Sequence, residues 1–321
     1  MPEPLSIMRR NLLFAGLAGA LATRIAPAGA AADPAHRADT PAWPAPADAP
    51  PVRIPDSHQF DVTVAGRARR LFVALPAERS TSAPHPVLVV LDGNALFPLA
   101  APLARNRAAR PDAGHDPAPV VIGIGYPTDA PYDMQARADD YTLAPLPNGP
   151  GLVADRFLDF IEHDVQPWLA RQWPIDADRQ TLFGHSYGGL LTLYALLTRP
   201  HLFRRYVAAS PSIWWGERAL LPYADRFAAA TAPLDPTLRV VVTAGSLEEG
   251  APHPDAERMR RQQARKQVSS ARDFVRRVGR RAGVDATFRL IDGEDHGGVV
   301  VPSAALAARI ACAPDHREVP A

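Results

Sequence analysis

One segment determines the fold of this chain: Thr181-Leu182-Phe183-Gly184-His185-Ser186-Tyr187-Gly188-Gly189. A short apolar strand pattern leads into Gly-x-Ser-x-Gly, and an apolar helical pattern follows it as far as Leu197. A serine on such a sharp strand-to-helix turn holds its hydroxyl clear of the backbone, where it can act as a nucleophile. The flanking glycines lack a Cβ and allow strand and helix to approach closely. The segment therefore predicts Ser186 as a nucleophile, with the N–H of Tyr187 facing a developing oxyanion.

Strand and helix patterns alternate on both sides of this turn. An antiparallel hairpin is predicted from the alternating apolar residues of 58–64 and 70–75, which flank Ala65-Gly66-Arg67. Continuous apolar runs at 87–91 and 120–124 then predict strands buried on both faces. Further strands are predicted at 181–183, 205–209, 239–243 and 287–291. Helical spacing is found at 151–173, 190–197, 255–283 and 302–312. This order predicts an α/β-hydrolase fold, a doubly wound and mostly parallel sheet with an N-terminal antiparallel hairpin.

A serine nucleophile needs a base, and in this fold the histidine comes from the loop after the last strand. His296 occupies that loop, within Asp292-Gly293-Glu294-Asp295-His296-Gly297-Gly298. His185 is adjacent to the serine in sequence, so its side chain should point elsewhere, and we interpret it as structural. The acid should follow the strand at 239–243, where Gly245-x-x-Glu248 makes Glu248 the first candidate and Glu249 the second. Asp255, Glu257 or a Ser–His dyad without an acid are the remaining alternatives.

The second oxyanion donor should come from the loop after the strand at 87–91, which reads Asp92-Gly93-Asn94-Ala95. We assign the N–H of Asn94 to this role, together with that of Tyr187. The same residues can also form a capped helix N-terminus, and the two interpretations are compatible. This chemistry uses side chains and backbone amides alone, so no metal and no cofactor is predicted.

The N-terminus and the composition restrict compartment and partners. Arg9-Arg10 and the apolar run 11–25 predict an export signal peptide over 1–32, by the Sec or the twin-arginine route, and no stable membrane anchor after cleavage. A Pro- and Ala-rich linker (33–57), an esterase domain (58–312) and a tail (313–321) follow. The expected location is periplasmic or secreted. The 35 Lys and Arg nearly balance the 34 Asp and Glu, which argues against nucleic-acid binding. The basic run Arg258-Met259-Arg260-Arg261 with Arg265-Lys266 is interpreted as a solvated helix face, with a basic patch as the alternative.

Further motifs resemble one family of known enzymes. Ordered along the chain, they are Leu91-Asp92-Gly93-Asn94-Ala95, Ile124-Gly125-Tyr126-Pro127, Arg137-Ala138-Asp139-Asp140-Tyr141-Thr142, the serine turn, Ser210-Pro211-Ser212-Ile213-Trp214-Trp215 and Asp295-His296-Gly297. Over about residues 58–309 the chain resembles the putative-esterase family of α/β-hydrolases, and within it the siderophore esterases that act on enterobactin- and bacillibactin-type substrates. The resemblance implies hydrolysis of the ester bonds of a tri-catecholate, ferric or iron-free. It also implies the same roles for Ser186, His296, Asn94 and Tyr187.

The resemblance also suggests substrate contacts. Arg137 matches the motif arginine, and its fork of N–H donors would suit catecholate oxygens; a salt bridge to Asp139, Asp140 or another loop acid is the alternative. Trp214 and Trp215 could stack on catechol rings, and we expect one of the two to be packed inside. Two other functions stay open: a general carboxylesterase on small acyl or aryl esters, and a non-catalytic siderophore-binding protein.

Overall fold

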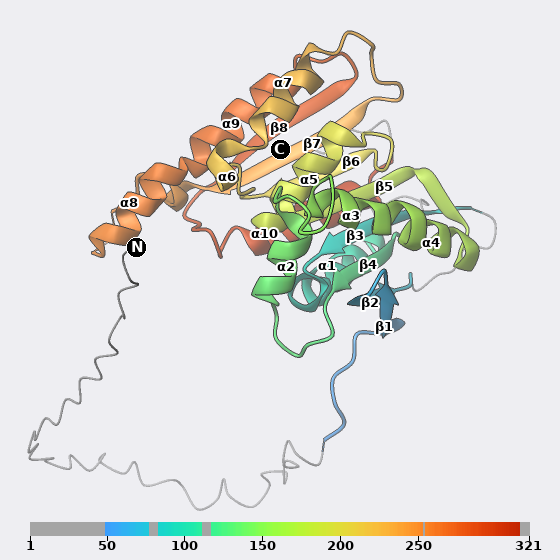
Figure 1. The fold of residues 1–321 in the computed structure, drawn as a ribbon. Coiled ribbons are helices and arrows are strands. Elements are labelled where there is room, and N and C mark those ends of the chain that lie inside the picture. The colour runs from blue at the N-terminus through green and yellow to red at the C-terminus, as the bar shows by residue number, and fades with distance from the viewer. Residues whose placement is uncertain (1–48, 77–82, 111–116, 253, 315–321) are drawn as a thin grey trace, which may run out of the picture. The chain divides into compact units, whose positions relative to one another are not determined.

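A mixed eight-stranded sheet organises the chain, and the computed structural model describes residues 49–76, 83–110, 117–252 and 254–314 (Figure 1). The strand order is β1-β2-β4-β3-β5-β6-β7-β8. β1 pairs antiparallel with β2, and β2 with β4, whereas all other neighbours are parallel. The bounds are β1 Ser57–Val64, β2 Arg67–Ala74, β3 His85–Leu91, β4 Val120–Gly125, β5 Ile175–His185, β6 Arg205–Ala209, β7 Leu238–Gly245 and β8 Val284–Ile291. The predicted α/β-hydrolase architecture with its N-terminal hairpin is confirmed.

Helices cover both faces of the sheet. One face packs against α1 and α10, and the other against helices that include α3, α5, α7 and α9 (Figure 1). The helices are α1 Gly93–Ala108, α2 Met134–Tyr141, α3 Val153–Phe160, α4 Gln166–Gln172, α5 Tyr187–Thr198, α6 Trp215–Arg218, α7 Leu221–Ala229, α8 Ala256–Arg265, α9 Gln267–Val278 and α10 Val300–Cys312.

Strand β3 shows why a continuous apolar run belongs at the centre of such a sheet. Leu88 and Val90 pack toward α1 and α10, while Val87, Val89 and Leu91 pack into the core on the opposite face. All five side chains are fully buried. Burying an aliphatic side chain of this size stabilises the fold by about 1.5–3 kcal/mol, so both faces of β3 contribute.

The carboxyl ends of the parallel strands meet at one edge of the sheet. β3, β5, β7 and β8 end at Leu91, His185, Gly245 and Ile291, and every predicted catalytic or oxyanion residue follows one of these four ends. Ligands of open α/β sheets bind at this edge, because its loops converge there from several strands.

Two predicted helices are interrupted in the structure. The helix expected over 151–173 contains a π-helical segment, Ile161–Val165, between α3 and α4. The helix expected over 255–283 is divided into α8 and α9 by Lys266, whose φ of 48° is left-handed. A helix start near Asn94 was an open alternative, but the full length of α1 was not predicted, because it contains Pro98 and Pro102 and internal prolines argue against a helix.

Residues 1–48 and 315–321, which include the predicted signal peptide and most of the linker and tail, lie outside the described residues. In the ranges that are described, no helix combines the length and apolar character needed to cross a membrane.

Candidate active site

Ser186 occupies a strained turn between β5 and α5. Its φ of 58° and ψ of −113° are unusual for a residue with a side chain. Gly184 before it is required sterically, since a Cβ at that position would lie 2.3 Å from the carbonyl oxygen of Gly188. The predicted strand–turn–helix is therefore present, and it leaves the hydroxyl half-exposed at the sheet edge.

His296 reaches the serine from the loop after β8. Its Nε2 lies 3.1 Å from Ser186 Oγ, although the two residues are 110 positions apart in the chain. This is the hydrogen-bond distance over which an imidazole can take the proton of a nucleophile.

Glu248 completes the row on the far side of the imidazole. Its Oε2 lies 2.6 Å from His296 Nδ1, and its Oε1 accepts hydrogen bonds from the Gly245 N–H at 2.7 Å and from the Ser210 hydroxyl. Only 5% of Glu248 is exposed, so a buried carboxylate orients the ring and would stabilise its protonated form. Ser186, His296 and Glu248 thus form a continuous hydrogen-bonded row.

Glu249, the second candidate acid, points elsewhere. Its carboxylate accepts hydrogen bonds from the backbone N–H of Ser269 at 2.7 Å and from the Ser269 hydroxyl at 2.8 Å. The carboxylate of Glu249 therefore anchors the start of α9, and of the two candidates only Glu248 reaches His296.

The loop after β3 forms the other side of the nucleophile. The side chain of Asn94 donates to the carbonyls of Tyr126 and Thr128 at 2.9 and 2.8 Å, and its Oδ1 accepts from the Tyr126 N–H. No described residue accepts a hydrogen bond from the backbone N–H of Asn94 or of Tyr187. A Cβ on Gly188 would lie 3.4 Å from Leu91 Cβ, which places this loop against the serine turn. Both amides thus remain available for an oxyanion.

Arg137 is buried and pairs with Asp92 of the loop after β3. It donates two hydrogen bonds to the carboxylate of Asp92, at 2.9 and 2.8 Å, and a longer one of 3.4 Å to the carbonyl of His185. Only 4% of Arg137 and 2% of Asp92 are exposed. Burial disfavours the charged guanidinium, but the hydrogen bonds and charge of Asp92 outweigh it and raise the pKa of Arg137. Of the two predicted roles, this geometry favours the salt bridge, with Asp92 as the partner.

The motif around Arg137 connects helix α2 to the oxyanion loop and to the hairpin. Asp140, one turn later on α2, accepts two hydrogen bonds from Arg69 of β2, and the Tyr141 hydroxyl accepts the N–H of Asp92. Residues at i, i+3 and i+4 share one face of a helix, so one face of α2 holds both the oxyanion loop and the hairpin. The Arg-x-x-Asp-Tyr motif is therefore explained by positioning of the loop.

His185 contacts the loop after β8 that carries His296. Its Nε2 lies 2.8 Å from the carbonyl oxygen of His296, and the two ring centroids are 4.7 Å apart. Burial, reinforced by the charge of His296, lowers the pKa of His185 to about 3, so the ring is neutral and its Nε2–H donates to that carbonyl. The predicted structural role of His185 agrees with this position.

Ser210 and Ser212 were missed by the sequence argument. Both follow β6: Ser210 donates to Glu248, and Ser212 Oγ lies 3.3 Å from Ser186 Oγ. In the sequence, the Ser-Pro-Ser segment indicates only a resemblance to the esterase family. Its position after a strand next to β5 was the signal that these hydroxyls would reach the nucleophile.

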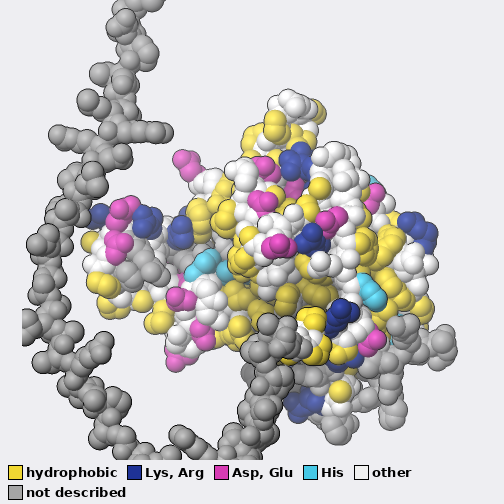
Figure 2. All heavy atoms as spheres, turned by 90° about the horizontal axis from the view of Figure 1, so that it is seen from below, with side chains coloured by type: hydrophobic (Ala, Val, Ile, Leu, Met, Phe, Trp, Pro, Cys, Tyr) yellow, Lys and Arg dark blue, Asp and Glu magenta, His cyan; other side chains and the backbone are white. Residues whose placement is uncertain are grey.

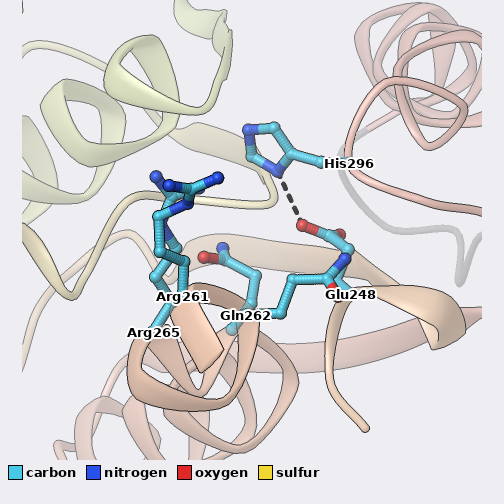
Figure 3. Close-up of a pocket in the computed structure, with 6 residues that line it drawn as sticks. Glu248, Arg261, Gln262, Arg265 and His296 are labelled. Atoms are coloured by element: carbon cyan, nitrogen blue, oxygen red, sulfur yellow. Dashed lines mark hydrogen bonds and ion pairs between the residues drawn. The ribbon is translucent and has the colours of Figure 1, made fainter. Parts of the chain in front are cut away.

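A cavity of about 250 Å³ opens beside His296 (Figure 3). It is lined by Glu248, Arg261, Gln262, Arg265, Gln267 and His296. Trp214 and Trp215 are both half-buried; Trp215 packs against the core, whereas the Trp214 ring lies 4.4 Å from the Arg265 guanidinium and 6.3 Å from the Tyr187 ring. Among the residues that the structure describes, no three His, Cys, Asp or Glu side chains gather as metal ligands would.

Comparison with known proteins agrees with this geometry. Residues 63–285 match the family described as "Putative esterase". The chain belongs to this family. As a member of the esterase family it is a serine ester hydrolase.

Several members of the esterase family are similar to this chain over most of its length. The ferri-bacillibactin esterase BesA of Bacillus subtilis is 33% identical over 263 residues, covering 78% of this chain and 86% of the relative. The siderophore triacetylfusarinine C esterase of Aspergillus fumigatus is 37% identical over 231 residues, covering 68% and 78%. The solved structure of siderophore hydrolase EstB from Aspergillus nidulans has a TM-score of 0.72 at 30% identity, covering 84% and 99%.

Proposed function

We propose that this esterase hydrolyses the ester bonds of a siderophore of the tri-catecholate class, with Ser186 as nucleophile and His296 as base. The observation that carries the mechanism is the continuous row from Ser186 Oγ to His296 Nε2 at 3.1 Å and from His296 Nδ1 to Glu248 at 2.6 Å. The similarity to the ferri-bacillibactin esterase supports a tri-catecholate, and the two other relatives support a siderophore ester more generally.

The first half of the reaction forms an acyl-enzyme. Ser186 Oγ attacks the ester carbonyl carbon while His296 Nε2 takes the hydroxyl proton, and Glu248 stabilises the imidazolium. The carbonyl oxygen becomes negatively charged and accepts hydrogen bonds from the N–H groups of Asn94 and Tyr187. When the tetrahedral intermediate collapses, the C–O bond to the alcohol breaks and His296 returns the proton to the leaving oxygen.

Water completes the cycle. His296 takes a proton from a water molecule, which attacks the acyl-enzyme, and the second tetrahedral intermediate releases the acid and restores the Ser186 hydroxyl. In a cyclic tri-ester the first cleavage opens the ring, and later cleavages release its monomers.

The test is to compare kcat/KM for ferric and iron-free tri-catecholate tri-esters with that for p-nitrophenyl esters. A clear preference for the tri-catecholates supports the proposal. Efficient cleavage of p-nitrophenyl esters alone would favour a general carboxylesterase, and tight siderophore binding without turnover would favour a binding protein.

We also propose that the protein acts after export, because Arg9-Arg10 and the apolar run 11–25 form a signal-peptide pattern. Mass spectrometry of the protein from periplasmic and culture fractions would detect loss of the first ~30 residues, the usual length of such signals. An intact N-terminus on cytoplasmic protein would contradict export.

A further inference from the structure

Helix α8 brings an unusual concentration of positive charge to the cavity. Its sequence AERMRRQQAR contains four arginines and one glutamate. Figure 2 shows Lys and Arg side chains on the lobe at the left of the molecule, and Figure 1 places α8 on that side, extending beyond α9. Arg261 and Arg265 line the cavity beside His296, so the expected solvated face of this helix is in part a cavity wall.

The spacing of these two arginines is unfavourable in the absence of a ligand. Residues at i and i+4 are neighbours on a helix surface, and like charges there destabilise the helix. Figure 3 shows both side chains extending from α8 toward the His296 side of the cavity. An anion between them would turn this repulsion into attraction.

The carboxylates near the cavity do not neutralise this charge. Glu248 is held by His296, Gly245 and Ser210. Glu257 pairs with Arg261, but the two side chains are 68% and 55% exposed, and pairs so exposed contribute little. No carboxylate of a described residue lies within ion-pair distance of Arg265.

Arg265 is held by an aromatic ring. Its guanidinium lies 4.4 Å from the centre of the Trp214 ring, a cation–π contact that orients it without using its N–H donors. Those donors make no hydrogen bond to any described residue. Trp214 in turn lies beside Tyr187, the residue after the nucleophile. A flat apolar surface and a free guanidinium are thus combined near the reacting serine.

We propose that Arg261, Arg265 and Trp214 form an anion-binding subsite for the negatively charged aryl groups of the ester substrate. The subsite rests on the proposed function and supplies the anion contact that Arg137 cannot make. Trp214 contacts the flat face of the aryl group while the two guanidinium groups bind its oxygens.

The test uses two small inhibitors that differ in charge. Salicylate is an anionic aryl group, and salicylamide is its uncharged counterpart at mildly acidic pH. Both are measured as competitive inhibitors of p-nitrophenyl butyrate hydrolysis by the wild type, Arg261→Ala, Arg265→Ala and the double variant. Arg260→Ala is the matched control, because Arg260 is exposed on the same helix and does not line the cavity.

The measured quantity is the inhibition constant of salicylamide divided by that of salicylate, which cancels general damage to a variant. We expect the wild type to prefer salicylate, and Arg265→Ala to reduce the ratio by about fivefold to twentyfold, since charge-assisted hydrogen bonds are lost at a partly exposed site. The double variant should bring the ratio close to one, and Arg260→Ala should leave it unchanged.

Two results would overturn the subsite: a wild-type ratio near one, or a ratio that Arg260→Ala reduces as much as Arg265→Ala does. The siderophore assay separates this inference from the proposed function. If tri-catecholates are not cleaved but the ratio falls as expected, the substrate proposal fails and the anion subsite stands. If they are cleaved and the ratio does not change, only the subsite fails.

Discussion

The oxyanion loop and helix α8 use arginine in opposite ways. On the oxyanion side, Arg137 is buried, its Nε and Nη2 donate to the carboxylate of Asp92, and Nη2 also donates to the His185 carbonyl. On the α8 side, Arg265 is exposed, stacks on Trp214 and donates to no described residue. A buried guanidinium with a bidentate partner holds a loop in place, whereas an exposed guanidinium without one can exchange water for a ligand.

The largest expected effect tests the nucleophile, Ser186. Ser186→Ala should lower kcat by roughly a thousandfold to a millionfold, because the nucleophile is lost while the oxyanion loop and helix α8 stay in place. The variant should still bind salicylate in a fluorescence titration. Retention of more than about a thousandth of wild-type kcat would contradict the assignment.

The second prediction compares two neighbouring carboxylates. Glu248→Gln should lower kcat by about ten thousandfold, because an amide cannot hold the imidazole in the same tautomer or stabilise its positive charge. Glu249→Gln is the matched control and should change kcat little, since its partner is Ser269. Equal, small losses in kcat for the two variants would indicate a Ser–His dyad.

The third prediction compares Arg137 and Arg265 directly. Arg137→Ala leaves the buried Asp92 unpaired, so the free energy of unfolding should fall by about 3–5 kcal/mol. Arg265→Ala removes an exposed side chain and should change it by less than about 0.5 kcal/mol. Urea unfolding followed by tryptophan fluorescence measures both. A similar, small loss for each would mean that Arg137 is not the structural anchor proposed for the oxyanion loop.

The smallest effect concerns His185 and pH. Because its pKa is about 3 when folded and about 6.5 when unfolded, the unfolded state binds more protons between these values, and stability falls as pH decreases through this window. The loss is about 1.4 kcal/mol per pH unit, or about 2 kcal/mol at pH 5 relative to neutral pH. His185→Gln, which keeps a donor for the His296 carbonyl, should remove this part of the acid slope.

Unfolding free energies of the wild type and His185→Gln at pH 5 and at neutral pH provide the measurement. Identical acid slopes in the two proteins would show that His185 titrates normally and is not held neutral by burial.

Local patterns in the sequence were sufficient to predict the strands and the turn that carry the site. The hairpin, the central strands and the serine turn each depend on neighbouring residues, through alternation, apolar runs and glycines. The chain order of the fold then placed Ser186, Glu248 and His296 at strand ends, where the structure brings them within hydrogen-bond distance.

Only the tertiary structure decided the partners of the charged side chains. Arg137 is 45 residues from Asp92, and Arg265 is 51 residues from Trp214. Such pairs depend on how the helices pack against the sheet and against each other, and local periodicity does not specify this packing. The chain itself determined that a serine nucleophile would stand at the sheet edge; packing determined which arginine was buried as a structural anchor and which was left free at the cavity, because burial requires a partner for each charge.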